Sequence, residues 1–196
     1  MEQDDRTQYK SKEEVAIILD ILPNGHPLDH RPGQRPQAVA QAIGKNHFSL
    51  LELVPKKDNT VQAREEVYIG EGKRDKVHHV LGRVAIERLT PTANAELESV
   101  LHDLVKKNEA RFVQFFNEAR PLTTRMHQLE LIPGFGKKHM WEIIERRQEK
   151  PFASFADMRA RVHLMPDPEK GIVKRLLAEI AGTEKHNLFV EAQRML

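Results

Sequence analysis

The sequence contains no cysteine, few aromatic residues and no long hydrophobic run. The absence of cysteine excludes disulfides, cysteine zinc sites and thiol catalysis together. No apolar run approaches the ~20 residues of a membrane-spanning helix, so we expect no membrane association. Residues Met1–Lys12 are acidic and polar, unlike a secretion signal, and we therefore expect a cytoplasmic protein. Aromatic residues make up only 6% of the chain, which leaves little material for a base-stacking surface.

Catalytic motifs are also missing from the sequence. It contains no Gly-x-Ser-x-Gly, no phosphate-binding Lys-Ser/Thr loop and no dinucleotide fingerprint. Isolated carboxylates beside predicted strands show no convergence on a metal: Asp20, Asp29 and Glu52. The adjacent histidines His78 and His79 are predicted to face opposite ways on a strand, which disfavours joint ligation. We therefore expect no enzyme, no cofactor and no metal.

The first half of the chain is punctuated by Gly and Pro and is rich in short β-type segments. The predicted strands are Glu14–Leu22, His47–Val54, Glu65–Ile69 and Lys76–Leu89. Gly82 is predicted at a bulge or bend, and the proline-rich connection Asn24–Gln37 as an ordered surface loop. Four or five short strands with one long connection predict a small barrel or curled sheet over residues 13–90, after an extended N-terminus at 1–12.

After Thr90 the hydrophobic periodicity is helical almost to the end, which predicts a helical domain over residues 91–196. The expected helices are Ala95–Ala119, one from Thr123 or Thr124 through Ile132, Lys137–Arg147, one from Ser154 to about Val162, one from Asp167 to Gly182, and Thr183–Met195. Ser154 and Asp157 have the spacing of a capping box, and Asp167 with Pro168 is typical of a helix start. Aromatic residues at helical spacing are expected in the core: Phe112, Phe115, Phe116 and Trp141.

The most informative segment is the turn Pro133–Gly136, which joins two of these predicted helices. Gly134 and Gly136 allow a sharp turn and a close approach to another molecule, and Phe135 is expected to point back into the core. The turn leaves backbone N–H groups free at a helix N-terminus, a geometry that holds phosphate. Lys137 and Lys138 add positive charge there. The alternative is a turn that only packs against protein.

Basic residues gather around this turn although the net charge is only +2. Residues 120–150 contain seven Lys or Arg against four Asp or Glu, whereas residues 1–119 contain seventeen against nineteen. Such an excess is expected of a phosphate-facing patch, or of an ordinary solvated helix surface. Arg125 and His127 precede the turn and are candidates for the same phosphate path.

Two further basic segments lie in the first half. Lys73, Arg74 and Lys76 follow a Gly-containing turn and are candidates to track a nucleic-acid strand, or else form a solvated hairpin tip. In the proline-rich loop, Arg31 is a candidate for the same basic surface, or pairs with Asp29.

The order of elements resembles a tandem helix-hairpin-helix arrangement, a motif that grips a nucleic-acid backbone without reading its bases. The first hairpin would span about 124–147 and a degenerate second one about 155–181. Its turn, Met165–Gly171, lacks Gly-x-Gly and carries Asp167 and Glu169. We expect weaker phosphate binding at this second turn, or a purely structural role.

Several phrases of the sequence together resemble an uncharacterised archaeal family, a numbered domain of unknown function whose members are described as RNA-binding. The phrases are Glu14–Asp20, Arg31–Pro32, Phe48–Leu53, Val67–Gly70, Lys73–Lys76, Arg111–Asn117, Thr124–Leu131 and Gly134–Lys138. The resemblance covers nearly the whole chain after Lys12. It implies an α+β protein, with an OB-like or S1-like N-terminal barrel and a C-terminal tandem helix-hairpin-helix domain.

These observations favour a non-enzymatic protein that binds nucleic acid through phosphates, which position a ligand without specifying sequence. The family resemblance favours RNA over DNA. One alternative is a protein–protein module associated with the ribosome or with transcription. Another is an accessory factor of DNA repair or recombination that binds duplex DNA.

Overall fold

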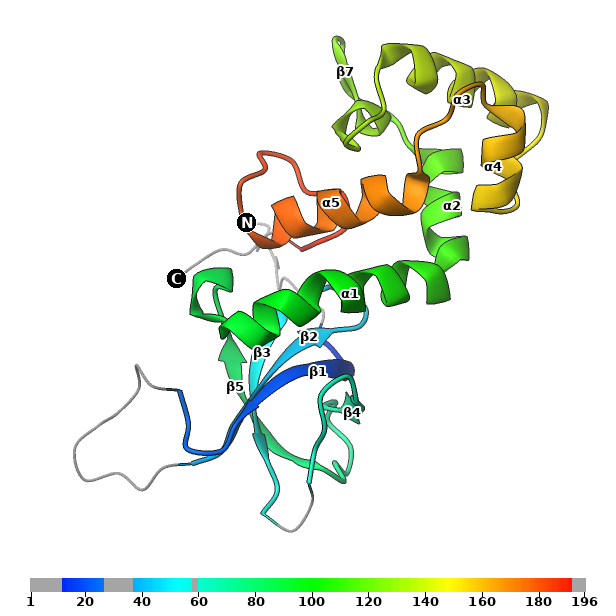
Figure 1. The fold of residues 1–196 in the computed structure, drawn as a ribbon. Coiled ribbons are helices and arrows are strands. Elements are labelled where there is room, and N and C mark those ends of the chain that lie inside the picture. The colour runs from blue at the N-terminus through cyan, green and yellow to red at the C-terminus, as the bar shows by residue number, and fades with distance from the viewer. Residues whose placement is uncertain (1–11, 27–36, 58–59, 192–196) are drawn as a thin grey trace, which may run out of the picture. The chain divides into compact units, whose positions relative to one another are not determined.

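The chain folds as two units that differ in secondary structure. The structure, a computed structural model, describes residues 12–26, 37–57 and 60–191. The boundary between the units lies between Arg83 and Val84 (Figure 1). A sheet dominates the N-terminal unit and helices dominate the C-terminal unit, so the predicted α+β class is confirmed. No helix among the described residues is long and apolar enough to cross a membrane.

The N-terminal unit is a curled, antiparallel half-barrel. Its strands are β1 (Val15–Leu22), β2 (Val39–Gly44), β3 (Leu50–Pro55), β4 (Glu66–Tyr68) and β5 (Val77–Arg83). They lie in the order β4-β1-β2-β3-β5, so that β4 and β5 are edges of the described sheet. Strand β2 was not among the predicted strands, because its central Ala40, Gln41 and Ala42 have no marked β-propensity. All of β2 is nevertheless buried.

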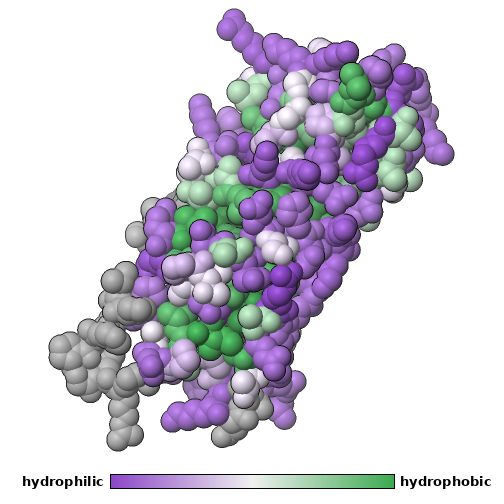
Figure 2. Space-filling view, in the orientation of Figure 1, coloured by the Kyte–Doolittle hydropathy of each residue, from purple (hydrophilic) through white to green (hydrophobic). Residues whose placement is uncertain are grey.

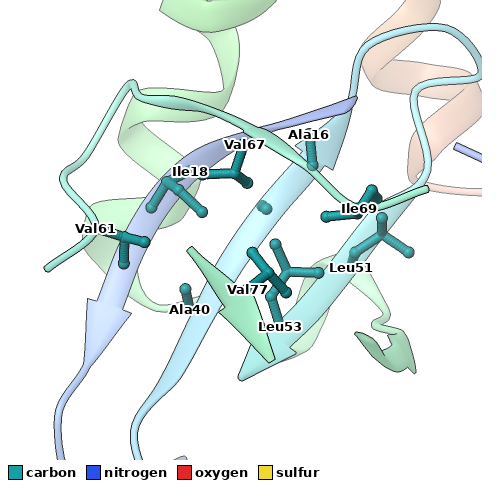
Figure 3. Close-up of a cluster of buried hydrophobic side chains, with 10 residues drawn as sticks. Ala16, Ile18, Ala40, Leu51, Leu53, Val61, Val67, Ile69 and Val77 are labelled. Atoms are coloured by element: carbon teal, nitrogen blue, oxygen red, sulfur yellow. The ribbon is translucent and has the colours of Figure 1, made fainter. Parts of the chain in front are cut away.

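Alternate residues of the strands supply a hydrophobic core on one face of this sheet. Figure 3 shows these side chains converging: Ala16, Ile18, Ala40, Leu51, Leu53, Val61, Val67, Ile69 and Val77. Because successive strand residues point to opposite faces, a period of two places each strand's members on the same side. A register shift between Ile18 and Asp20 interrupts the alternation in β1, as a bulge that bends the strand does.

Strand β5 is shorter than predicted and contains two bulges. Gly82 has a φ of +156°, and a register shift lies between its partner Glu52 and Leu53, so the predicted bulge at Gly82 is confirmed. A second shift leaves His78 as an extra residue, and the Nδ1 atoms of His78 and His79 lie 2.7 Å apart. The prediction that these two side chains face opposite ways is therefore wrong, because a bulge breaks the alternation.

The C-terminal unit is mainly helical. Its elements are η2 (Ile86–Arg88), α1 (Pro91–Lys107), α2 (Glu109–Glu118), β6 (Pro121–Thr123), β7 (Met126–His127), η3 (Gln128–Leu131), α3 (Lys137–Glu149), α4 (Phe155–Arg161) and α5 (Pro168–Ile180). The predicted single helix Ala95–Ala119 is wrong, because Asn108 separates α1 from α2. Its side-chain amide donates to the Leu104 oxygen at 3.0 Å, and its backbone leaves the helical region.

The predicted helix from Thr123 or Thr124 to Ile132 is also wrong. This segment forms the short β6–β7 hairpin and the 3-10 helix η3. His127 caps η3: its Nδ1 accepts from the Leu129 N–H at 3.1 Å, and the Glu130 carboxylate accepts from the His127 N–H at 3.0 Å. These reciprocal bonds begin a helical turn at Gln128, four or five residues after the predicted start at Thr124 or Thr123.

The predicted helix Thr183–Met195 is wrong over 183–191, where bends and irregular backbone replace it; residues 192–196 lie outside the described residues. The buried carboxylate of Glu179 accepts from three consecutive N–H groups, those of Leu188, Phe189 and Val190, at 2.7–2.9 Å. Arg175 bonds to the same carboxylate at 2.7 Å. Tertiary hydrogen bonds therefore replace the helical ones that local spacing predicted.

Candidate functional site

The turn Pro133–Gly136 lies at the surface, except for one side chain. Pro133, Gly134 and Gly136 are exposed. Phe135 is 3% exposed and its ring centroid lies 5.5 Å from that of Phe116, which confirms that it points into the core. Gly134 has a φ of +93°, a conformation that strains any residue with a Cβ. The buried ring anchors the turn while the glycines leave its backbone accessible.

Several N–H groups of this turn and of the first turn of α3 have no protein acceptor. The Phe135 N–H donates to the Ile132 oxygen at 3.0 Å and closes the bend. The first backbone bond of α3 is the one from Met140 to Gly136, also 3.0 Å, as expected because the leading N–H groups of a helix lack intrahelical partners. Within the described part of the chain, no acceptor contacts the N–H of Gly136, Lys137 or Lys138.

The lysines that begin α3 carry charge that no acidic residue among those described neutralises. Lys137 and Lys138 are exposed, and neither forms an ion pair with a residue that the structure describes. They stand at the positive end of the α3 dipole, where cations are unfavourable and anions are favourable. Unpaired N–H groups, helix dipole and ammonium groups thus all favour an anion here.

The exposed side of α3 includes a tryptophan that was predicted to be in the core. Trp141 is 64% exposed, whereas Met140 and Ile143 are buried and Ile144 is half-buried. The prediction is wrong because three neighbouring apolar residues already define the buried stripe. Figure 2 shows apolar residues reaching an otherwise hydrophilic surface in the region of α3 and α4. No sequence signal distinguished this tryptophan from a core residue.

The start of α5 differs from that of α3, because the protein satisfies it internally. The Asp167 carboxylate accepts from the N–H groups of Glu169 and Lys170 at 3.0 and 3.3 Å, which confirms the predicted N-cap. Arg159 lies 3.9 Å from Asp167 and 3.7 Å from Glu169. An anion at this helix end would therefore compete with a carboxylate that is already present.

Close packing against α5 supports the exposed turn. A Cβ on Gly171 would come within 2.9 Å of the Ile132 side chain and 3.1 Å of the Pro133 oxygen, so only glycine permits this approach. The Arg175 guanidinium donates to the Leu131 oxygen at 3.2 Å. Both contacts hold the segment that leads into the turn.

The segment between α4 and α5 is also held against α3. The His139 Nε2 lies 3.1 Å from the Leu164 oxygen. The Glu142 carboxylate accepts from the His163 N–H at 2.8 Å. These bonds fix the side of α3 that adjoins the α4–α5 loop, and neither of them involves Lys137 or Lys138.

Of the two candidates that precede the turn, only one is at the surface. Arg125 is exposed in the β6–β7 turn, and its N–H donates to the Thr123 hydroxyl at 3.2 Å. His127 is buried and serves as the cap of η3. Burial lowers the pKa of His127, and the nearby Arg147 charge lowers it further. The expectation that His127 reaches a phosphate path is therefore wrong.

The basic residues Lys73, Arg74 and Lys76 lie in the N-terminal unit, in the connection between β4 and β5. The Arg74 Nε donates to the Gly70 oxygen at 2.8 Å, and Lys76 pairs with Glu65, which lowers the pKa of that carboxyl through a hydrogen bond. Only the Lys73 side chain lacks a partner among the described residues. Arg31, the remaining candidate, lies outside the described residues.

The part of the chain that the structure describes contains no group of three or more His, Cys, Asp or Glu placed to hold a metal ion.

The structure brings together five of the predicted site residues in one surface turn: Gly134, Phe135, Gly136, Lys137 and Lys138. This arrangement offers backbone N–H donors and two ammonium groups to an anion.

Three comparisons with known proteins all indicate the same family. A family model described as "Protein of unknown function (DUF655)" matches residues 12–191. The uncharacterized protein MJ0038 of Methanocaldococcus jannaschii is 41% identical over 196 residues, which cover 96% of this chain and 87% of that protein. The crystal structure of Af1531 from Archaeoglobus fulgidus is similar with a TM-score of 0.82 and 45% identity, over 91% of this chain and all of that chain. The chain belongs to the DUF655 family, an uncharacterised family with archaeal members, as its resemblance predicted.

Proposed function

We propose that the C-terminal unit binds the phosphate backbone of a nucleic acid, and of RNA in preference to DNA, without sequence specificity. The contact is the turn Pro133–Gly136 with the first turn of α3, which acts as a helix-hairpin-helix-type turn whose first helix is reduced to η3. In the same proposal the half-barrel is OB-like and Lys73 adds a second, weaker contact.

One observation carries this proposal. The N–H groups of Gly136, Lys137 and Lys138 have no acceptor among the described residues, at an exposed helix N-terminus that bears two unpaired ammonium groups. Each of these groups is a donor, and a phosphate offers several acceptor oxygens and negative charge. Since phosphates are common to every sequence, contacts of this kind position a nucleic acid without reading it. The preference for RNA rests on the family resemblance alone.

The test measures binding of a fluorescently labelled structured RNA and a duplex DNA by anisotropy, over a series of salt concentrations. We expect log K to fall linearly with log salt, because neutralised phosphates release counterions. In the Lys137→Glu/Lys138→Glu variant we expect weaker binding of both ligands. The loss of two phosphate contacts makes the salt slope shallower, by about 1.8 for duplex DNA.

A matched control variant is Lys106→Glu/Lys107→Glu, at the end of α1. It changes the net charge equally at two adjacent exposed lysines of the same unit. We expect it to lower the general electrostatic attraction and to leave the salt slope almost intact, and thermal unfolding checks that the variant stays folded, because both lysines lie in the last turn of α1. Negative charge at the start of a helix interacts favourably with the helix dipole, so the two glutamates should not destabilise α3. A loss of binding in the test variant would therefore not result from unfolding. Equal affinity of the test variant and the wild type would overturn the proposal.

A further inference from the structure

The single tryptophan of this chain is placed where a bound nucleic acid would pass. Trp141 follows Lys137 by four residues and Lys138 by three in α3. Residues at these spacings are neighbours on the same side of a helix, about 5–6 Å apart at their Cβ atoms. The indole is therefore adjacent to the charges that carry the proposed phosphate contact.

The indole ring has no partner within the chain that the structure describes. It is 64% exposed, and no aromatic or cation contact to it occurs among the described residues. The adjacent acid Glu142 uses a carboxylate oxygen to accept from the His163 N–H. An exposed indole thus stands beside two ammonium groups that have no ion-pair partner among the described residues.

The chemistry of this surface fits one class of ligand. Nucleic acids combine phosphates with aromatic bases, and bases stack on exposed aromatic side chains regardless of sequence. In a duplex the bases are already stacked and paired, so only unpaired bases are free to contact an indole. The two lysines complement the charge of the phosphates that flank such a base.

We propose that Trp141 stacks on an unpaired nucleobase, so that the ligand of the C-terminal unit is single-stranded or looped nucleic acid. This inference rests on the proposed phosphate contact at Lys137 and Lys138. It goes further by naming the part of a nucleic acid that is recognised, and it assigns a binding role to a residue that helical spacing placed in the core.

The test uses the full chain and the emission of Trp141, which no other tryptophan obscures. The two ligands are a 12-nucleotide oligouridylate and a blunt duplex without unpaired bases. We expect saturable quenching with the oligouridylate and little change with the duplex. In the Trp141→Ala variant we expect the oligouridylate, labelled for anisotropy, to bind about 5- to 150-fold more weakly, and the duplex within about twofold of the wild type.

Two further variants separate stacking from a general effect. Trp141→Phe keeps an aromatic face, and we expect it to recover most of the affinity. Leu81→Ala removes another exposed apolar side chain, 50% exposed and in the N-terminal unit, and we expect no change in either ligand.

The outcomes distinguish the two proposals. If both ligands bind and Trp141→Ala changes neither or weakens both equally, the stacking role is overturned while the phosphate contact stands. If neither ligand binds the wild-type protein at low salt, both proposals fall. Binding of the oligouridylate that Lys137→Glu/Lys138→Glu leaves intact but Trp141→Ala abolishes would overturn the phosphate contact and the inference that depends on it.

Discussion

The starts of α3 and α5 lie in the same unit and differ in whether a protein side chain accepts from their free N–H groups. Each helix leaves N–H groups without backbone partners. At α5 the Asp167 carboxylate accepts from two of them. At α3 the N-cap is Gly136, which has no side chain to do so, and two lysines follow. One helix end is closed by the protein's own anion, and the other is open to an external one.

The difference shows that a helix N-terminus indicates an anion-binding site only when its cap residue leaves the N–H groups free. Both segments contain Pro and Gly near a helix start, yet Asp167 makes one of them self-sufficient. An uncapped end is less stable by itself. The proposed role of the α3 end in binding fits this open end beside Lys137 and Lys138, whereas the Asp167 cap stabilises the start of α5.

The largest effect on stability is expected from substituting Arg175, which belongs to α5 and also contacts the segment before the α3 turn. Arg175 is 3% exposed, bonds to Glu179 at 2.7 Å and reaches the Leu131 oxygen before the open turn. Arg175→Ala leaves the Glu179 carboxylate buried without its cation, and we expect the free energy of unfolding to fall by about 3–5 kcal/mol. Chemical denaturation followed by far-UV circular dichroism measures this loss.

The neighbouring substitution Lys174→Ala is the control for that measurement. Lys174 is exposed on the same helix, so its removal should change stability by no more than about 0.5 kcal/mol. Similar stabilities of the two variants would contradict the anchoring role of Arg175.

An exchange of caps tests the comparison of the two helix ends directly. Gly136 has a φ of −84° and open space where a Cβ would stand, so Gly136→Asp fits without strain. We expect it to raise stability by up to about 1 kcal/mol, because a carboxylate caps the helix and favours its dipole. The same carboxylate occupies and repels the phosphate site, and we expect RNA affinity to fall about tenfold.

The reciprocal variant Asp167→Gly should lower stability by a few tenths of a kcal/mol, since glycine is a tolerable cap. It should not weaken RNA binding. Thermal unfolding and anisotropy on both variants separate stability from affinity. If Gly136→Asp bound RNA as tightly as the wild type, the open end of α3 would not be the contact.

The smallest effect concerns pH. Burial lowers the pKa of His127 in the folded state, with Arg147 acting in the same direction. Between the folded pKa and the unfolded value of about 6.5, the unfolded chain binds more protons, so stability rises with pH in that window. We expect unfolding free energy to decline as the pH falls from 7 towards 5. His127→Asn keeps a capping acceptor without this titration and should flatten that decline; an unchanged pH profile would contradict the assignment.

Much of the architecture could be predicted from the sequence because it depends on local signals. Four of the five strands of the N-terminal unit, the bulge at Gly82 and the caps at Ser154 and Asp167 follow from neighbouring residues. The buried Phe135 and the exposed glycines of the turn are equally local. Strand β2 was missed because its burial comes from neighbouring strands and not from its own propensity.

The sequence by itself determined that residues 133–138 form an exposed, basic turn at a helix start, because glycine conformation and lysine charge belong to those residues alone. Only the tertiary structure decided that Trp141 faces outward, that His127 faces inward, and that residues 183–191 leave the helical path. Periodicity identifies apolar residues on a helix, but the space available in the core decides which of them are buried, and that space is set by segments distant in the chain.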